Sequence, residues 1–183
     1  MKKQPEITDA TRDAFIDVFC GLALKKPIGS ITIREITEAA GYNRTTFYRY
    51  FADVYTLLNY IEDSLIKDFS QSANVKGQFA LNDNFFKSIM DFMQTNKDRM
   101  LVVFSESNRS SFIAKLQKYI MKNIGMENSA HNAMAMTIYF SGLTAALTAW
   151  LKEPDTIAED DLTSMMSRLF SEWYLPEITK NKQ

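Results

Sequence analysis

Apolar residues recur every three or four positions along most of the chain, which is the spacing of helices with one buried face. In the first part of the chain this pattern predicts helices that start near Thr8 or Asp9, after Thr32, after Asn43 and near Asp53. Runs typical of strands are scarce, so the predicted fold class is all-α. Further helices are predicted over residues 83–95, 97–104, 109–124, 130–152 and 158–173.

The second and third predicted helices are short, and each carries signals for its ends. Thr32 and Glu35 have the Thr-x-x-Glu spacing of a capping box, in which the two residues bond reciprocally at a helix start. Gly41 follows the last apolar position of the second helix, where the left-handed backbone of a helix end favours glycine. Asn43 is suited to cap the third helix. Two short helices joined by a tight turn form a helix-turn-helix pattern.

The chain of 183 residues has the length of one large domain or of two small ones. We predict a domain boundary at residue 52, with residues 1–52 forming a small helical head and residues 53–183 a larger helical domain. Segment 72–83 reads as a loop. Residues 1–52 hold eight Lys or Arg and six Asp or Glu, a net charge of +2, whereas residues 53–183 hold thirteen and sixteen, a net charge of −3.

Composition argues against an enzyme. Cys20 is the single cysteine, so neither an intramolecular disulfide nor a cysteine-rich metal site can form. The single histidine, His131, starts an apolar helix and has no carboxylate or second metal ligand at a fixed spacing. No phosphate-binding loop or nucleophile motif occurs. We therefore expect no catalytic residues, no metal and no cofactor.

One apolar stretch raises the question of a membrane. Asn128–Leu151 contains no Asp, Glu, Lys or Arg and is long enough to cross a bilayer. Its hydroxyl residues and alanines, and the lack of Lys/Arg asymmetry around it, favour a buried helix of a soluble protein. A membrane span is the alternative. The N-terminus has no apolar stretch of a secretory signal, so we expect a cytoplasmic protein without membrane contact.

The third helix has the side chains of a DNA recognition helix. Arg44, Thr45 and Thr46 lie on its first turn, the part that enters the major groove and contacts base edges. Tyr48 and Arg49 lie on the next turn and are suited to phosphate oxygens. The alternative is a structural helical hairpin with a solvated polar face.

The stretch "ITIREITEAAGYNRTTFYRYFADVYTLL" resembles the DNA-binding domain of the TetR family of bacterial transcriptional regulators. The resemblance covers residues 8–58 and implies a three-helix DNA-binding head followed by a helical domain for dimerisation and ligand binding. It implies phosphate contacts for Thr32 and Tyr48, and base or backbone contacts for Arg34. Many members carry a phosphate-binding lysine where this chain has Val54. The DNA-binding residues predicted from pattern and resemblance together are Thr32, Arg34, Asn43, Arg44, Thr45, Thr46, Tyr48, Arg49 and Tyr50.

The C-terminal domain offers a candidate dimer interface and a candidate pocket. Small residues on one side of helix 130–152 would let a partner helix approach closely, and helix 158–173 adds large apolar residues. Burial inside a monomer is the alternative. The predicted interface residues are Ala135, Ile138, Gly142, Ala146, Ala149, Met166, Phe170 and Trp173.

Several Phe and Met residues of this domain are candidates for a ligand pocket, although they could equally form a filled core. These residues are Phe86, Met90, Met93, Met100, Phe104 and Phe112.

These features give one main functional hypothesis. It is a transcriptional regulator, of the repressor type common in the family, that binds a pseudo-palindromic DNA operator as a homodimer and responds to a small-molecule effector of unknown identity. The C-terminal sequence is similar to a TetR subgroup related to dihydroxyacetone kinase regulators, some of which are coactivators. The alternative is therefore a TetR-fold coactivator that acts through protein contacts and binds DNA weakly or not at all.

Overall fold

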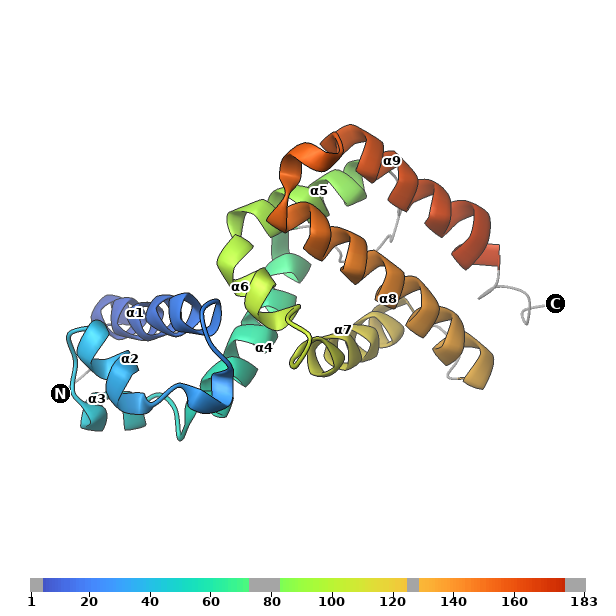
Figure 1. Cartoon of the computed structure of the whole chain (residues 1–183). Coiled ribbons are helices and arrows are strands. Elements are labelled where there is room, and N and C mark those ends of the chain that lie inside the picture. The colour runs from blue at the N-terminus through green and yellow to red at the C-terminus, as the bar shows by residue number, and fades with distance from the viewer. Residues whose placement is uncertain (1–4, 73–82, 125–128, 177–183) are drawn as a thin grey trace. The chain divides into compact units, whose positions relative to one another are not determined.

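The computed structural model describes residues 5–72, 83–124 and 129–176, and within these ranges the chain forms helices and no strand (Figure 1). The helices predicted over 83–95, 97–104, 109–124 and 130–152 have the observed bounds to within one residue, and the all-α prediction is confirmed. The α-helices in chain order are α1 (Pro5–Ala23), α2 (Ile33–Ala39), α3 (Arg44–Tyr48), α4 (Val54–Ser72), α5 (Asp83–Thr95), α6 (Lys97–Val103), α7 (Arg109–Ile124), α8 (Ala130–Lys152) and α9 (Glu159–Arg168).

Two short helical segments and the π form of a third were not predicted. Two are single 3-10 turns, η1 (Ile28–Ser30) and η2 (Pro154–Thr156). The third is η3 (Leu169–Tyr174), a π-helix that continues α9. The sequence pattern predicts one continuous α-helix over 158–173, because apolar periodicity does not reveal the wider turn of a π-helix.

The chain divides into two compact units, residues 1–64 and 65–183. In the first unit α2 packs against both α1 and α3. Phe15 and Phe19 of α1, Ile36 of α2 and Phe47 of α3 have no exposed surface, and Leu57 of α4 completes the same core. The division falls within α4, whereas the predicted domain boundary is at residue 52. That functional boundary stays a prediction.

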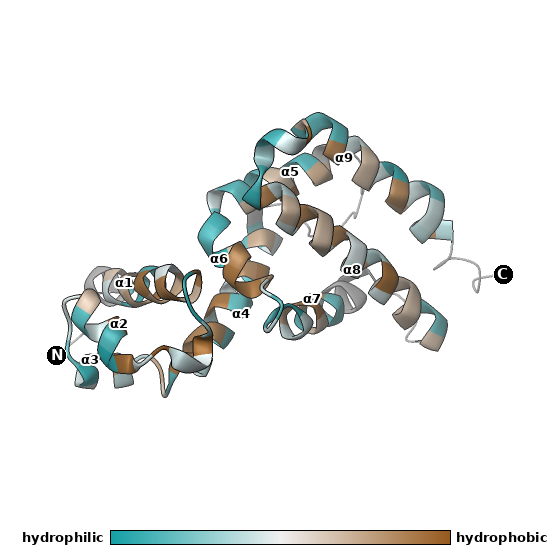
Figure 2. Cartoon of the chain, in the orientation of Figure 1, coloured by the Kyte–Doolittle hydropathy of each residue, from teal (hydrophilic) through white to brown (hydrophobic). Residues whose placement is uncertain are grey.

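In the second unit α5 packs along α9, and α8 contacts α6, α7 and η3. Its fully buried side chains include Phe86, Met90 and Met93 of α5 and Met136 of α8. In Figure 2 α8 is coloured mostly white to brown, in agreement with its lack of charged residues before Lys152. The unit is therefore a helical bundle around an aromatic and methionine-rich interior.

Among the described residues, α8 is the one helix long and apolar enough to cross a membrane, and 50% of its most apolar window is buried in the structure. Met136, Phe140, Leu143 and Leu147 are all part of the buried side. A half-buried helix packed against its neighbours is the arrangement expected of a core helix.

Candidate functional site

The start of α2 is held by the capping box that the sequence predicts. The Thr32 hydroxyl accepts a hydrogen bond from the Glu35 backbone N–H at 3.2 Å, and the Glu35 carboxylate accepts one from the Thr32 backbone N–H at 2.9 Å. Lys26 Nζ donates to the same carboxylate at 2.6 Å. Lys26 and Thr32 together lower the pKa of Glu35 from 4.5 to about 2, so this carboxylate is charged at neutral pH.

The turn between α2 and α3 has the geometry of a Schellman motif. Gly41 has a φ of +74°, the left-handed conformation that glycine adopts without strain. The backbone N–H of Tyr42 donates to the Thr37 carbonyl at 2.9 Å, and that of Gly41 donates to the Glu38 carbonyl at 3.3 Å. Gly41 therefore ends α2 sharply and sets the direction of the chain into α3.

Asn43 caps α3 and also fixes the side chain of Thr46. The Asn43 Oδ1 atom accepts hydrogen bonds from the Thr46 backbone N–H at 2.8 Å and from the Thr46 hydroxyl at 3.1 Å. Both residues were predicted as DNA-binding residues. In this structure their polar groups stabilise the helix start.

An aromatic cluster on the opposite side fixes the rotation of α3. Phe47 is fully buried, with its ring edge-on to Phe15 at 5.3 Å and tilted against Phe51 at 5.6 Å. Tyr50 is half-buried, with its ring 6.1 Å from that of Phe15. This cluster directs the remaining side chains of α3 to the solvent.

The solvent-facing side of α3 carries four of the predicted DNA-binding residues, Arg44, Thr45, Tyr48 and Arg49. Tyr48 is 57% exposed. Within the part of the chain that the structure describes, the side chains of Arg44, Thr45 and Arg49 make no hydrogen bond or ion pair. They are therefore free to bind a ligand that lies along α3. We name Arg44, Thr45, Tyr48 and Arg49 the α3 face.

The other predicted residue on α2 is engaged in a surface ion pair. Arg34 Nε lies 2.7 Å from the Glu38 carboxylate, and both side chains are more than half exposed. Such an exposed pair contributes little to stability. Val54, at the position where many family members have lysine, is 9% exposed and packs into the first unit.

The second unit contains a cavity of about 120 Å³. Five of the six predicted pocket residues line it: Phe86, Met93, Met100, Phe104 and Phe112. Met90 is fully buried but is not one of the residues that line the cavity. The described lining carries no charged side chain, and tyrosines were missing from the prediction although Tyr139 and Tyr174 both line the cavity.

The predicted interface residues separate into exposed and buried groups. Ile138, Gly142, Ala146, Ala149 and Trp173 are exposed, and Ile138 reaches 54%. Ala135, Met166 and Phe170, by contrast, are buried inside the unit itself and offer no surface to a partner.

Three exposed methionine and leucine residues were missed by the prediction. They are Met134 of α8, Met165 of α9 and Leu169 of η3, with 61%, 60% and 46% of their surface exposed. Together with Ile138, Gly142, Ala146, Ala149 and Trp173 they are the exposed apolar residues of α8, α9 and η3, which we name the α8–η3 face. Large exposed apolar residues in one region are typical of an interaction surface.

Two family models match this chain. One, described as bacterial regulatory proteins of the tetR family, matches residues 20–61. The other, described as a transcriptional regulator C-terminal region, matches residues 83–172. The first match spans α2, α3 and the start of α4, and the second spans α5 to η3.

Solved structures of TetR-type regulators have the same fold. A TetR-family transcriptional regulator from Bordetella parapertussis matches with a TM-score of 0.60 at 17% identity, over 90% of this chain and 95% of that chain. The dihydroxyacetone kinase operon activator DhaS matches with a TM-score of 0.52 at 17% identity, over 92% and 96%. The fatty acid degradation regulator FadR from Bacillus halodurans matches with a TM-score of 0.55 at 15% identity, over 92% and 96%. With both of its parts matched by these regulator models, the chain belongs to the TetR family of bacterial transcriptional regulators, which are not enzymes.

Proposed function

We propose that this protein binds a pseudo-palindromic DNA operator as a homodimer through the α3 face. The observation that carries the proposal is the pair of arginines, Arg44 and Arg49, which are exposed without a partner in the described structure on a helix whose other side is fixed by Phe47. A rigid helix with free guanidinium groups is suited to reading DNA, because both the phosphates and the guanine edge accept hydrogen bonds from arginine.

The residues of the α3 face take different roles in this proposal. Arg44 and Thr45 lie on the first turn of α3, the part of a recognition helix that contacts base edges. Arg44 donates two hydrogen bonds to a guanine, and Thr45 offers a hydroxyl and a methyl group. Tyr48 and Arg49 follow on the next turn and bind phosphate oxygens, which fixes the register of the protein on the duplex.

The α8–η3 face is the proposed dimer interface. A two-fold interface requires one surface that is complementary to itself, and a palindromic operator requires a two-fold protein. The small residues Gly142, Ala146 and Ala149 let a partner helix approach closely, while Ile138, Met165 and Trp173 supply apolar area at its sides. Their exposure in the single chain supports this assignment.

The cavity of the second unit is the proposed effector site. It is lined by apolar and aromatic side chains, which is typical of small-molecule sites. Binding there would change the affinity of the cytoplasmic regulator for its operator.

The first experiment is a mobility-shift titration of the full chain on its own upstream DNA region. A scrambled duplex of the same length and composition is the control. The expected result is an affinity at least a hundredfold higher for the upstream region than for the scrambled duplex. Specific protein–DNA complexes have affinities roughly a thousandfold or more above those of non-specific complexes. Equal binding to both duplexes would contradict operator recognition in that region, and selection from random duplexes would then test for any specific site.

A coactivator that binds DNA weakly is the second candidate. Two points favour it. The resemblance to the TetR family implies a phosphate-binding lysine at the position of Val54, which is buried here, and one structure with the same fold is an operon activator. Failure to select any specific duplex, with the chain still folded and dimeric, would make this candidate the leading one.

A further inference from the structure

The cavity of the second unit is small and almost without polar groups. Its volume of about 120 Å³ is close to that of an engineered cavity of about 150 Å³ that binds benzene. More than half of the described lining residues are aromatic, and none carries a charge. The cavity therefore suits a compact apolar molecule, and aromatic rings pack well against such walls.

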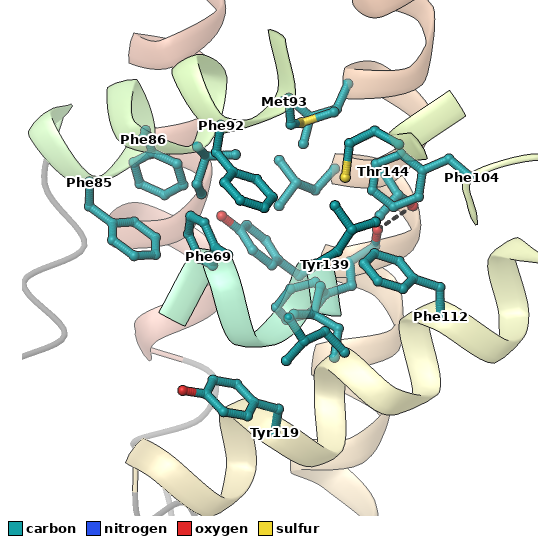
Figure 3. Close-up of a pocket in the computed structure, with 18 of the residues that line it drawn as sticks. Phe69, Phe85, Phe86, Phe92, Met93, Phe104, Phe112, Tyr119, Tyr139 and Thr144 are labelled. Carbon is teal, nitrogen blue, oxygen red and sulfur yellow. Dashed lines mark hydrogen bonds between the residues drawn. The ribbon is translucent and has the colours of Figure 1, made fainter. Parts of the chain in front are cut away.

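Among the lining residues with a hydroxyl group, two tyrosines stand out because their hydroxyls are buried and unpaired. Tyr139 of α8 and Tyr174 of η3 line the cavity, with 4% and 2% of their surface exposed. Their rings stack at a centroid distance of 4.7 Å and an interplanar angle of 22°. In the described part of the chain neither hydroxyl has a hydrogen-bond partner. Figure 3 shows the Tyr139 hydroxyl directed toward the rings of Phe69, Phe86 and Phe92.

A buried hydroxyl without a partner is unfavourable, because its hydrogen bond to water is lost on folding and not replaced. Burial raises the pKa of both tyrosines, and the neighbouring Tyr174 adds to the rise of the Tyr139 pKa. Both phenols thus keep their protons at neutral pH and remain hydrogen-bond donors. The third lining hydroxyl that is deeply buried, Thr144, already donates to the Phe140 carbonyl at 2.7 Å.

We infer that the effector is a small, uncharged and mostly apolar molecule, preferably aromatic, whose single hydrogen-bond acceptor binds the Tyr139 hydroxyl, with Tyr174 as the adjacent second donor. This inference deepens the proposed effector control and rests on it. The ligand supplies the acceptor that the buried phenol lacks, and its apolar body fills the space between the phenylalanines.

Other ligand classes fit less well. A carboxylate would lose its hydration without gaining a cation, since the described lining has none. A pure hydrocarbon would leave both hydroxyls unpaired. A single water molecule needs two to four polar partners, and the phenylalanine-lined space near Tyr139 offers few.

The test compares three probes of matched size by isothermal titration calorimetry on the full-length protein without DNA. Acetophenone carries a carbonyl acceptor, isopropylbenzene carries a methyl group in its place, and benzoate carries a charge. Acetophenone is expected to bind roughly five- to tenfold more tightly than isopropylbenzene, because one neutral hydrogen bond contributes about 1 kcal/mol. Benzoate is expected to bind most weakly.

Two variants assign the hydrogen bond. Tyr139→Phe should abolish the preference for acetophenone, and, because it removes an unpaired hydroxyl, the ligand-free variant should melt at the same or a higher temperature than the wild type. Tyr119→Phe is the matched control. Tyr119 also lines the cavity, but its hydroxyl points away from the phenylalanines in Figure 3, so acetophenone binding should not change.

Three results would overturn the inference: equal or tighter binding of isopropylbenzene, tightest binding of benzoate, or an unchanged acetophenone preference in Tyr139→Phe. A lower melting temperature of ligand-free Tyr139→Phe would also contradict it, because the hydroxyl would then have a partner already. The calorimetry contains no DNA, so its outcome is independent of operator recognition. Release of operator DNA by acetophenone tests the effector role separately.

Discussion

At the scale of single residues, the helix-turn-helix separates side chains that build the motif from side chains that are free to bind. Thr32, Asn43 and Thr46 use their hydrogen-bonding groups within the protein, in the two helix caps. Arg44 and Arg49 do not, in the part of the chain that is described. The sequence pattern placed all five in one DNA-binding set, because a cap and a phosphate contact use the same residue types.

The capping box makes the stability of α2 dependent on pH. The pKa of Glu35 is lowered from 4.5 to about 2 in the folded chain, so its charged form stabilises the fold. This contribution is fully present above about pH 4.5 and is lost as the pH falls towards 2. Glu35→Gln should therefore increase hydrogen exchange of the α2 amides at pH 7, and the difference from the wild type should shrink as the pH approaches 3. Mass spectrometry of peptides that cover α2 measures this exchange.

Glu38→Gln is the control for that experiment. It removes only the exposed ion pair with Arg34 on the same helix, and such pairs contribute little. Exchange in Glu38→Gln should match the wild type at pH 7. Equal exchange in Glu35→Gln and the wild type at pH 7 would show that the capping box does not hold the start of α2.

At the scale of elements, α9 and η3 carry two rows of apolar residues, one buried and one exposed. Leu162, Met166 and Phe170 face the interior, whereas Met165 and Leu169 face the solvent. The i, i+3, i+4 pattern merges both rows into one stripe, so the sequence alone could not separate them. This is why Met166 and Phe170 were predicted for the interface while Met165 and Leu169 were missed.

The lining of the cavity could be predicted only in part from the sequence. Phe86, Met93, Phe104 and Phe112 were identified because Phe and Met are concentrated in one part of the chain. Tyr139 was not among the predicted pocket residues, and it lines the cavity together with residues of other helices. Helix bounds depend on local caps and periodicity and were predictable, whereas the composition of a cavity depends on contacts between distant segments.

The small residues of α8 provide a clean test of the α8–η3 face. A Cβ atom added at Gly142 would meet no atom within 4 Å, so a larger side chain fits the single chain. Gly142→Leu should therefore leave the monomer at least as stable, because leucine favours helix more than glycine does. In a close helix–helix interface it should cost about 1–3 kcal/mol through overpacking. Size-exclusion chromatography with light scattering should show more monomer on dilution.

Ala114→Leu is the matched control, since it adds the same side chain to an exposed position on α7. Its oligomeric state should equal that of the wild type. A wild-type protein that is monomeric at all concentrations would contradict the dimer interface, as would an unchanged dimer in Gly142→Leu.

At the scale of the whole molecule, the proposed DNA-binding and effector sites lie in different compact units. The α3 face belongs to the first unit, and the cavity and the α8–η3 face belong to the second. The π-helix η3 contributes to both features of the second unit, since Phe170 and Tyr174 line the cavity while Trp173 is exposed. An effector that displaces η3 would act on the proposed dimer interface directly. Any effect of the effector on operator affinity requires an equal effect of the operator on effector affinity.

Sequence-specific DNA reading by the α3 face is the central claim, and competition binding of Arg44→Ala to operator and random duplexes tests it most directly. The account predicts a loss of about 1–3 kcal/mol per half-site on the operator, since a bidentate guanine contact is removed, and little loss on random DNA. Arg49→Ala is the matched control and should weaken binding to both duplexes about equally. Two results for Arg44→Ala would contradict base reading by α3, provided that the variant melts like the wild type. They are an equal loss of affinity for both duplexes and no loss of affinity for either.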